Sequence, residues 1–578
     1  MDTPFTAAMR AGYALSEPAI ELGRPMLDGT VVTDVPVRVG LSMLNRHGLV
    51  AGATGTGKTK TLQLLAGQLS AAGVPCFVAD VKGDVTGIAE PGDPANPKVV
   101  QRCETLGVPF TPAGHPVELL SLTGKLGAPV RATVHSFGPT LLAKVLDLNE
   151  TQTAVLSLVF AYCDDGDLPL LDLADLRTTL QYLGTDAAKD AVAAYGGIST
   201  ATIGVILRSI LMLEQQGAEA FFGEPEFDVA DLLRTVPGPG GTDHGVVSLL
   251  ELSDVMDRPR LFSTFMLWLL AQLYVTLPEV GDLPRPKLCF FFDEAHLLFQ
   301  DASPALMEQI ERTARLIRSK GVGLFFVTQA PTDVPSSVLG QLGNRVQHAL
   351  RAFTPEDADD LRKTVRTFPT SPYYTDVGAT LTSLGIGEAL VTVLSPNGVP
   401  TPLAATRLLP PDSLMAALPP DRVAALVAAS PLAAKYREPV DRESAHEMIT
   451  RRIAEAKAAA PAVPAQTPAQ VAREERARTR DLQRQQAVAE REAKAEARRL
   501  ERERLAAERD AIAEARRLER ERAAAERAAA REETAARRAA ERQQQEMIRA
   551  GTRILTSRTG QQAIRSVFGT LFGGSARR

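Results

Sequence analysis

The sequence of 578 residues is poor in cysteine and in aromatic residues. Its four cysteines, Cys76, Cys103, Cys163 and Cys289, lie far apart and show none of the close spacings of metal ligands. We therefore expect neither a disulfide framework nor a zinc site. Cys76 and Cys289 fall in apolar runs and are interpreted as buried free thiols. This usage favours a reduced, cytoplasmic protein.

Segments that would place the chain in a membrane are also missing. Residues 1–17 show no basic start followed by an apolar stretch, so no signal peptide is expected. The most apolar helix candidate, 261–275, is too short and too interrupted to cross a bilayer. The apolar fraction of 45% is nevertheless sufficient for a sizeable core, and the length allows several domains.

Acidic residues outnumber basic residues over most of the chain. Residues 1–472 hold 37 basic and 51 acidic residues, whereas residues 473–549 hold 22 and 18. The last segment, 550–578, has five arginines and no acid. An acidic body argues against a broad surface that coats nucleic acid, although a ring can still enclose a basic pore. Composition alone therefore does not favour a nucleic-acid partner.

The stretch 52–59 is the strongest functional signal. It fits the pattern G-x-x-x-x-G-K-[ST] and lies between an apolar strand candidate and a helix candidate. Glycines let the backbone N–H groups point at phosphate oxygens, and the following helix adds the positive end of its dipole. Lys58 is expected to reach the β- and γ-phosphates, and Thr59 to ligate Mg²⁺. A plain glycine-rich turn would not require this lysine and threonine. The predicted ATP-binding residues are Gly52, Ala53, Thr54, Gly55, Thr56, Gly57, Lys58 and Thr59.

A pair of acids follows a second apolar run. Residues 288–292 are all apolar and lead directly into Asp293 and Glu294. In P-loop enzymes the first acid of such a pair holds the magnesium shell, and the second can polarise the attacking water. Asp293 is therefore predicted to bind Mg²⁺ together with Thr59, and Glu294 to be catalytic. His296 either approaches the γ-phosphate or caps a helix.

A third strand candidate, 323–328, ends at Gln329, which is placed to sense the γ-phosphate or to orient the water. The helix before this strand carries Arg312, Arg315 and Arg318 at intervals of three. Such a row is usually only solvated. In an ATPase that closes into a ring, however, one of these arginines could reach the nucleotide of a neighbouring subunit. Arg318 is the first candidate for this catalytic role, and Arg315 is the second.

Strand and helix signals alternate from about residue 47 onwards. This alternation predicts an α/β fold with a mainly parallel sheet covered by helices on both faces. Further strands are expected at 76–80, 246–252 and 348–352. The predicted segments are a short lead-in with a strand pair at 30–39 (1–46), the P-loop half of an ATPase core (47–99), a mostly helical insertion (100–240), the second half of the core (241–410), a Pro/Ala-rich connector (411–472), a long charged helix (473–549) and a basic amphipathic tail (550–578).

The segment 473–549 consists almost entirely of Ala, Glu, Arg and Gln. Its residues 498–508 recur at 516–526 with one change, and eighteen residues make five turns of an unstrained helix. Apolar residues at a period of seven are scarce, so a solvated helix with Glu–Arg pairs is favoured over a coiled coil, which stays as the rival. The tail resembles a docking or membrane-touching segment, or a helix that packs on its own chain.

Four ordered motifs, at 52–59, 80–84, 293–296 and 328–331, together resemble the HerA–FtsK superfamily of P-loop motor ATPases. The similarity is greatest to the HerA-like helicase branch of YjgR-type proteins and covers about residues 10–415. It implies a RecA-like core, a hexameric ring of identical subunits and ATP-driven movement on DNA. Fewer than fifty residues precede the P-loop strand, so the N-terminal β-barrel of HerA helicases is expected to be missing or much reduced.

The letters Asp-Glu-Ala-His at 293–296 also occur in DEAH-box helicases. Those proteins need a second RecA-like domain, for which the residues after 410 offer no candidate, so this interpretation is set aside. Two functions are carried forward. The first is a Mg²⁺-dependent ATPase that works on DNA as a ring, as a translocase or a helicase. The second is an ATP-gated scaffold that positions the C-terminal helix on a protein partner or a membrane.

Overall fold

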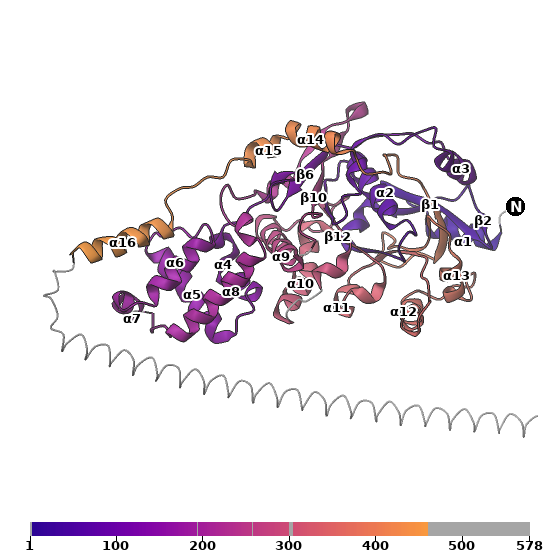
Figure 1. Ribbon diagram of the computed structural model, residues 1–578. Helices are drawn as coiled ribbons and strands as arrows, with labels where there is room; N and C mark the ends of the chain where they lie inside the picture. Colours follow the sequence, from indigo (N-terminus) through magenta and orange to yellow (C-terminus); the bar gives the residue numbers. More distant parts are fainter. Residues whose placement is uncertain (1–2, 194, 257, 300–303, 460–578) are drawn as a thin grey trace, which may run out of the picture. The chain divides into compact units, whose positions relative to one another are not determined.

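A large β-sheet runs through the computed structural model, which describes residues 3–193, 195–256, 258–299 and 304–459 (Figure 1). Within these residues the sheet has thirteen strands, in the order β2-β1-β15-β14-β13-β4-β12-β11-β5-β10-β6-β7, and β3 also pairs with β1. The strands are β1 Ala19–Leu27, β2 Thr30–Val31, β3 Val37–Gly40, β4 Gly48–Ala51, β5 Cys76–Asp80, β6 Val117–Ser121, β7 Ala128–Pro129, β10 Val247–Glu251, β11 Leu288–Phe292, β12 Val322–Thr328, β13 Asn344–His348, β14 Glu388–Thr392 and β15 Ala404–Leu408; a separate hairpin is formed by β8 Thr235–Pro237 and β9 Asp243–Gly245.

Helices connect these strands and cover the sheet (Figure 1). Their bounds are α1 Pro4–Gly12, α2 Lys58–Ala71, α3 Pro97–Leu106, α4 Val134–Val145, α5 Glu150–Asp165, α6 Leu173–Leu183, α7 Lys189–Ala193, α8 Thr200–Gln215, α9 Pro259–Thr276, α10 Pro304–Leu316, α11 Ser336–Leu339, α12 Pro355–Val365, α13 Val377–Ser383, α14 Pro420–Ala429, α15 Pro431–Tyr436 and α16 Ala445–Ala459. Among the described helices, none combines the length and the apolar character that crossing a bilayer requires.

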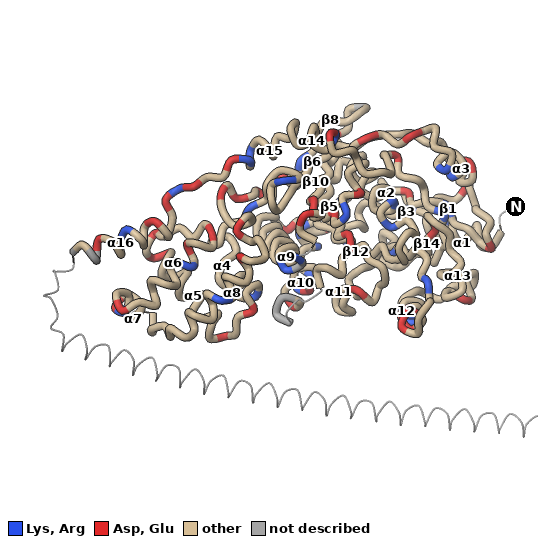
Figure 2. The backbone as a smooth tube through the Cα atoms, in the orientation of Figure 1, with Lys and Arg blue, Asp and Glu red and all other residues tan. Residues whose placement is uncertain are grey.

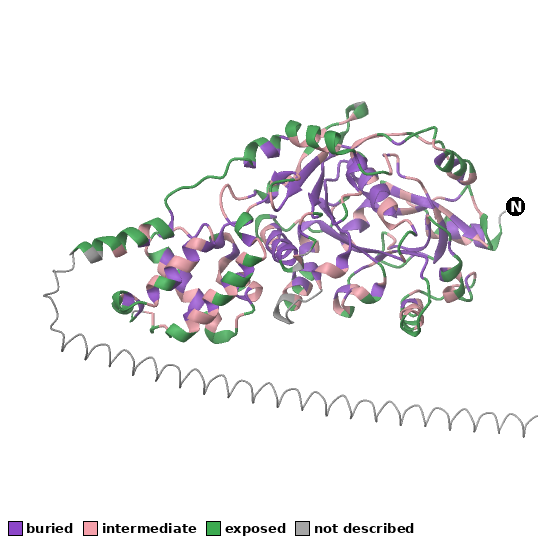
Figure 3. Cartoon of the chain, in the orientation of Figure 1, coloured by how far each residue is buried: buried purple, intermediate pink, exposed green. Residues whose placement is uncertain are grey.

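The half of the sheet from β13 to β7 is parallel, as the alternation of strands and helices predicts. Its central strands are buried along their whole length, because helices cover both faces (Figure 3). In β11, Phe290 and Phe292 belong to the core that α9 completes, whereas Cys289 and Phe291 belong to the core that α2 completes. Cys289 and Cys76 are buried free thiols, as the sequence indicates.

The other half of the sheet is antiparallel and brings distant parts of the chain together. β14 pairs with β13 and β15, and β15 pairs with β1. The predicted strand pair at 30–39 is wrong, because β2 and β3 each pair with β1 and not with each other. The strand predicted at 348–352 is also displaced, since β13 ends at His348. Both errors arise where pairing with a distant strand decides the bounds.

The segment 100–240 is not uniformly helical. Its residues 117–121 and 128–129 form β6 and β7 of the main sheet, and the helical part comprises α4 to α8. Trp268 of α9 joins this helical part to the sheet. Its ring stacks on Phe137, packs edge-on against Phe221, and its Nε1 donates to Ser136 Oγ at 3.1 Å.

The segment 411–472 is interpreted from its composition as a connector. Its described part is mostly helical and contains α14, α15 and α16. The chain docks back onto the helical part before and within α16. Tyr436 is buried and donates to Asp231 Oδ2 at 2.6 Å, and Asp175 Oδ1 accepts from His446 N at 2.8 Å. The predicted charged helix (473–549) and tail (550–578) lie outside the described residues.

His47 holds three elements together at the amino ends of the central strands. It precedes β4, its Nδ1 accepts from Leu324 N of β12 at 3.0 Å, and its Nε2 lies 2.8 Å from Ala314 O of α10. The ring therefore acts as a neutral bridge that donates on one side and accepts on the other. Burial is the main reason that its pKa falls from 6.5 to about 4.

We predict that the free energy of unfolding falls as the pH drops from about 6.5 to about 4. In this range His47 binds a proton in the unfolded chain, whereas in the folded chain it stays neutral. Above pH 6.5 both states are neutral at this residue, and below pH 4 both are charged, so the loss levels off at about 3 kcal/mol or less. Urea midpoints, followed by the fluorescence of the single tryptophan, should show a shallower pH dependence for His47→Asn than for the natural protein. Equal slopes for the two proteins would contradict this role.

Candidate active site

The four sequence motifs meet at the carboxyl edge of the parallel strands. β4 pairs with β12 in the register Ala51↔Thr328, and β12 pairs with β11 in the register Phe292↔Phe326. β11 in turn pairs with β5, with Phe292 opposite Ala79. The loops that follow these four strands therefore leave the sheet side by side, which is where open parallel sheets bind their ligands.

The P-loop is bonded to the strand ends on both sides of β4. Gly52 N lies 3.2 Å from Thr328 O and 3.1 Å from Gln329 O, and Ala53 N donates to Ala349 O at 2.9 Å. On the far side, Thr56 O accepts from Gly387 N at 2.9 Å. These bonds hold the loop in one conformation before any ligand binds.

Glycine is required at the two ends of the loop. At Gly52, φ is +154°, and an added Cβ would lie 2.4 Å from His348 Cβ. At Gly57, which precedes α2, φ is +112°. Both backbone conformations are strained for other residues, and both bring the chain close to its neighbours. The N-terminus of α2 is thereby left open to an anion.

Lys58 lies across the mouth of this loop. Its Nζ donates to Gly52 O at 2.8 Å, and Ala53 O lies 3.4 Å away. Burial lowers the pKa of Lys58, while the nearby carboxylates of Glu294 and Asp293 act against this shift. The ammonium group is thus held beside the backbone amides that would face a phosphate chain.

Asp293 and Glu294 follow β11 and are buried, with 2% and 6% of their surfaces exposed. Burial and the neighbouring acids Glu294 and Asp80 raise the pKa of Asp293 to about 7. Its Oδ2 has no hydrogen-bond partner among the residues that the structure describes. A buried oxygen without a partner is costly and is explained by a ligand that the site is built to receive.

Glu294 is ionised more easily than its neighbour. Burial alone would raise its pKa, but the hydrogen bond and the charge of Lys82 and the charge of Lys58 outweigh this effect and lower it. Lys82 Nζ lies 2.5 Å from Glu294 Oε1, and His296 Nδ1 lies 3.5 Å from Glu294 Oε2. The backbone of Glu294 is left-handed, with φ at +47°, a strained state that is typical of functional positions.

The loop after β5 completes an acidic cluster. Asp80 caps this loop, since its carboxylate accepts from Gly83 N at 2.8 Å and from Val85 N at 2.9 Å. Carboxylate oxygens of Asp80, Asp84 and Asp293 lie within 4.8 Å of one another. A donor set made only of oxygens suits Mg²⁺, and Asp293, whose Oδ2 has no hydrogen-bond partner among the described residues, belongs to this cluster. The three carboxylates therefore fit a magnesium ion, and Thr59 is half-buried in the first turn of α2.

Two residues of this region carry no prediction from the sequence. Glu251 ends β10 opposite Asp80, and burial next to Asp80 and Asp254 raises its pKa to about 8. His348 lies under the P-loop, where its Nε2 is 2.9 Å from Thr61 Oγ1 and burial lowers its pKa to about 4. Glu251 ends a largely apolar strand, a weaker form of the signal that identifies Asp293, so the sequence could have indicated it; β13 has no apolar run, and no such signal points to His348.

Gln329 belongs to the site, whereas the arginine row does not. The carbonyl of Gln329 contacts Gly52 N, and its side chain is exposed at the carboxyl end of β12. Arg315 is exposed at the end of α10, and Arg318 lies in the turn that leads into β12. Both arginines therefore lie near the amino ends of the parallel strands, whereas the P-loop of the same chain lies at the carboxyl ends.

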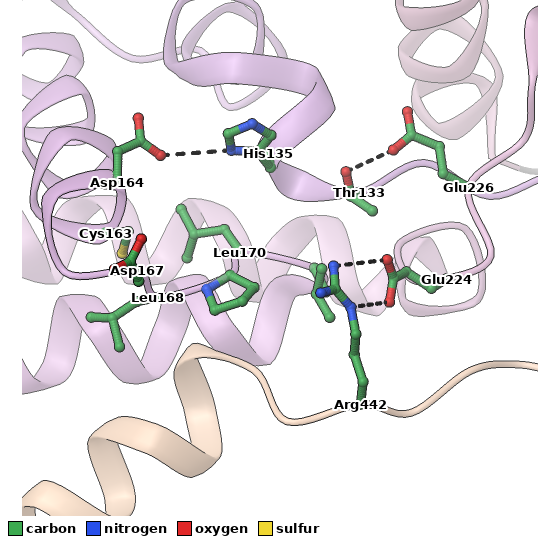
Figure 4. Close-up of a pocket in the computed structure, with 12 residues that line it drawn as sticks. Thr133, His135, Cys163, Asp164, Asp167, Leu168, Leu170, Glu224, Glu226 and Arg442 are labelled. Atoms are coloured by element: carbon green, nitrogen blue, oxygen red, sulfur yellow. Dashed lines mark hydrogen bonds and ion pairs between the residues drawn. The ribbon is translucent and has the colours of Figure 1, made fainter.

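A separate cavity of about 480 Å³ lies on the helical part, away from the P-loop (Figure 4). Arg442 forms an ion pair with Glu224 through Nε–Oε2 at 2.7 Å and Nη2–Oε1 at 3.0 Å. His135 Nδ1 lies 3.7 Å from Asp164 Oδ1 across the same cavity. These charged groups pair with one another, so we interpret the cavity as the seam where residues 437–444 dock on the helical part.

Comparison with known proteins gives one family and several weak structural similarities. The sequence matches the family described as helicase HerA-like C-terminal over residues 27–514. No curated protein matches it. Plasmid coupling protein TrwB in complex with ADP and Mg²⁺ is 15% identical with a TM-score of 0.43, and the alignment covers 68% of this chain and 95% of TrwB.

VirB4 of Thermoanaerobacter pseudethanolicus is 14% identical with a TM-score of 0.42, and the alignment covers 68% of this chain and 98% of VirB4. With TM-scores below 0.5, these similarities carry no weight for function. The family match, in contrast, spans most of the chain and includes all four motifs that meet at the edge of the sheet. The protein therefore belongs to the family described as helicase HerA-like C-terminal.

Proposed function

We propose that this protein is a Mg²⁺-dependent ATPase that works as a motor on DNA, as a hexameric ring of identical subunits. The ATPase part rests on one observation, namely that the P-loop and the acid pair lie together at the carboxyl ends of neighbouring parallel strands. There the P-loop with Lys58 faces Asp293 and Glu294, with one strand, β12, between them. The ring and DNA parts rest on membership of the HerA-like family.

Binding of the triphosphate is assigned to residues 52–59. Their backbone N–H groups and the positive end of the α2 dipole attract the phosphate chain, and Lys58 adds a full charge at the β- and γ-phosphates. Lys58 Nζ would then exchange its bond to Gly52 O for phosphate oxygens. The loop is already hydrogen-bonded to the end of β12 and to Gly387, directly before β14. Little conformational entropy is therefore lost when a nucleotide binds.

Thr59 and Asp293 are the residues assigned to magnesium, with Asp80 and Asp84 close enough to orient the waters around it. When bound, the ion neutralises charge on the phosphates and holds them in line for attack. A cation also offsets the repulsion that raises the pKa of Asp293 in its absence. The raised pKa and the unpartnered oxygen support this assignment.

Glu294 is assigned the role of general base for the attacking water. Its carboxylate is kept ionised by Lys82, and its Oε2 makes no hydrogen bond within the described residues, with His296 Nδ1 3.5 Å away. Gln329, at the end of the neighbouring strand, is assigned to orient that water or to sense the γ-phosphate. The roles of both residues follow from their place beside the loop rather than from a bound nucleotide.

Arg318, or Arg315 next to it, is assigned to the active site of a neighbouring subunit. Both residues lie near the amino ends of the strands, and their own P-loop lies at the carboxyl ends. An arginine finger from this row could therefore reach only the nucleotide of a neighbouring subunit. Figure 2 shows that acidic and basic residues are interspersed over the described chain. DNA contact is therefore assigned to an enclosed pore rather than to a broad basic face.

An ATP-gated scaffold is the second candidate, and one observation favours it. α16 is anchored through Asp175 to the helical part, and residues 460–472 separate it in sequence from the predicted charged segment. A movement of the helical part with the nucleotide state would therefore carry α16 with it, and the charged segment follows α16 in the sequence. Partners of this segment would be a protein or a membrane surface.

We predict that Glu294→Gln lowers the ATPase rate by about 10²–10⁴-fold while nucleotide binding persists, because an amide cannot accept the proton of the water. Steady-state turnover and ADP affinity measure the two effects. Glu150→Gln, an exposed acid at the start of α5, is the matched control and should leave both unchanged. Full activity of Glu294→Gln would contradict the assignment of the base.

We also predict that double- or single-stranded DNA increases ATP turnover several-fold, since motors couple hydrolysis to movement on their track. Particle mass in the presence of nucleotide should be about six times the 61.9 kDa of one chain. A turnover rate indifferent to every DNA tested, with hydrolysis intact, would remove DNA from the proposal and favour the scaffold. A stable monomer with full activity would remove the ring.

An arginine finger between subunits predicts complementation between two inactive variants. Arg318→Ala retains its own P-loop and Glu294, while Glu294→Gln retains its arginine. In rings formed from equal amounts of both, about a quarter of the interfaces are intact, so activity should return to that order. The same mixing with Arg315→Ala tests the second candidate. If neither mixture recovers activity although the rings exchange subunits, the finger is not in this row.

A further inference from the structure

Two further acids lie beside the magnesium cluster, where β10 ends next to β5. Glu251 is the last residue of β10 and is paired with Asp80 in the parallel register. Paired residues of neighbouring parallel strands point to the same face of the sheet, so these two side chains project on the same side. Asp254 follows in the turn directly after β10. The acidic edge formed by β5 and β11 therefore continues onto β10.

Glu251 is buried without a hydrogen bond. Only 5% of its surface is exposed, and its Oε1 has no partner among the residues that the structure describes. Its Oε2 faces the loop after β5, because a Cβ added to Gly83 would lie 3.3 Å from this oxygen. A carboxylate that loses its water on burial is costly unless another group takes the place of that water. The position of Glu251 therefore points to a ligand that the site receives.

The charged groups that act on Glu251 are themselves acids. Burial is the main reason that its pKa rises to about 8, and the charges of Asp80, Asp254 and Asp84 act in the same direction. No lysine or arginine among the described residues offsets this effect. An ion pair within the described protein therefore does not balance Glu251, and a cation from solution would.

The neighbouring acids Asp254 and Asp84 each offer one further oxygen. Asp254 Oδ2 accepts from Thr123 Oγ1 of the loop after β6, and Ser121 Oγ lies 3.2 Å from the same hydroxyl. This contact sets the orientation of the Asp254 carboxylate. Its Oδ1, like Oδ1 of Asp84, is buried and has no hydrogen-bond partner among the described residues. Three carboxylates in this region thus present oxygens that the described protein does not use.

One magnesium ion cannot take all of these oxygens. Mg²⁺ holds its ligands at about 2.1 Å, so two oxygens on the same ion lie at most about 4.2 Å apart. The acids whose oxygens come within 4.8 Å of one another are Asp80, Asp84 and Asp293, and neither Glu251 nor Asp254 belongs to this group. An ion held there leaves both without a cation. Because Mg²⁺ usually binds one or two carboxylates and keeps several waters, a pair of acids is sufficient for a second ion.

We infer that Glu251 and Asp254 bind a second divalent cation, beside the magnesium cluster to which Asp84 belongs. This inference goes beyond the proposed function, because the second ion is held by carboxylates of the protein and requires no phosphate chain. The ion links β10 to the loops after β5 and β6. The loop after β5 also carries Lys82, which pairs with Glu294. Occupancy of the second site therefore fixes the loop that supports the proposed catalytic base.

The test counts the Mn²⁺ ions that the full-length protein binds without nucleotide, by equilibrium dialysis. Mn²⁺ prefers the same oxygen ligands as Mg²⁺. Asp293→Asn disables the magnesium cluster and should still bind one ion, because the second site is intact. Adding Glu251→Gln or Asp254→Asn to this variant should remove that ion, since each change keeps the size of the side chain and removes its charge. In the natural protein, the same two changes should each lower the number of bound ions by one.

Thermal unfolding separates a lost site from a damaged fold. Without divalent ions, Glu251→Gln should have a Tm at or above that of the natural protein, because it removes a buried charge, and Mn²⁺ should raise this Tm less. Glu150→Gln, the exposed acid at the start of α5, is the control and should match the natural protein in both measurements. If Asp293→Asn binds no ion, or if neither Glu251→Gln nor Asp254→Asn lowers the number of ions, the inference is overturned. A natural protein that binds two ions but does not hydrolyse ATP would overturn only the proposed function.

Discussion

The parallel register of β4, β12, β11 and β5 is the constraint on which the site depends. Parallel strands place all their carboxyl ends at one edge, so the loops after Ala51, Asp80 and Phe292 emerge as neighbours. A slip of one strand would move its polar end along the sheet and turn its buried side chains to the wrong face. Burial of the apolar runs on both faces makes such slips costly, and the geometry of the site follows from the packing of the core.

Charge is divided sharply across this edge. On the β5–β11 flank, burial and, to a smaller extent, the charges of neighbouring acids raise the pKa of Asp80 to about 6 and that of Glu251 to about 8. On the β14 flank lies a cavity of about 190 Å³ with a mostly apolar lining, whose charged residues are the cations Lys60, Lys98 and Arg102. Clustered acids with raised pKa values destabilise a fold unless a cation joins them, and they are typical of functional sites. The P-loop therefore lies between a cluster of acids on one flank and a cavity whose charged lining residues are cations on the other.

Local patterns were sufficient for some of these features. The P-loop and the acid pair could be predicted because a few consecutive residues determine both the turn and its chemistry. The strands at 288–292 and 323–328 were found for the same reason, since their apolar runs are unbroken. The fold class followed from the alternation of strands and helices. The assigned roles of Glu294, Gln329 and the arginines stay predictions.

Features that depend on distant pairing could not be predicted in this way. β6 is short and lies in a segment with helical character on both sides, and only its pairing with β10 makes it a strand. Lys82 reaches Glu294 across 212 positions of sequence, and no local pattern indicates that contact. The position of Arg318 near the amino ends of the strands could also not be predicted. Helical spacing shows which face of the helix carries the arginines, but only the topology shows which end of the strands they lie near.

β12 has a mechanical consequence that follows from its two ends. It is buried over all seven residues, the turn with Arg318 precedes it, and Gln329 follows it. A buried strand that is hydrogen-bonded to β4 and β11 on either side deforms little along its length, because it is closely packed. In a closed assembly with Arg318 at the adjacent subunit's phosphates, a push at one nucleotide would be transmitted along this strand to the glutamine beside the next. Successive hydrolysis events would then be coupled through seven residues of the core.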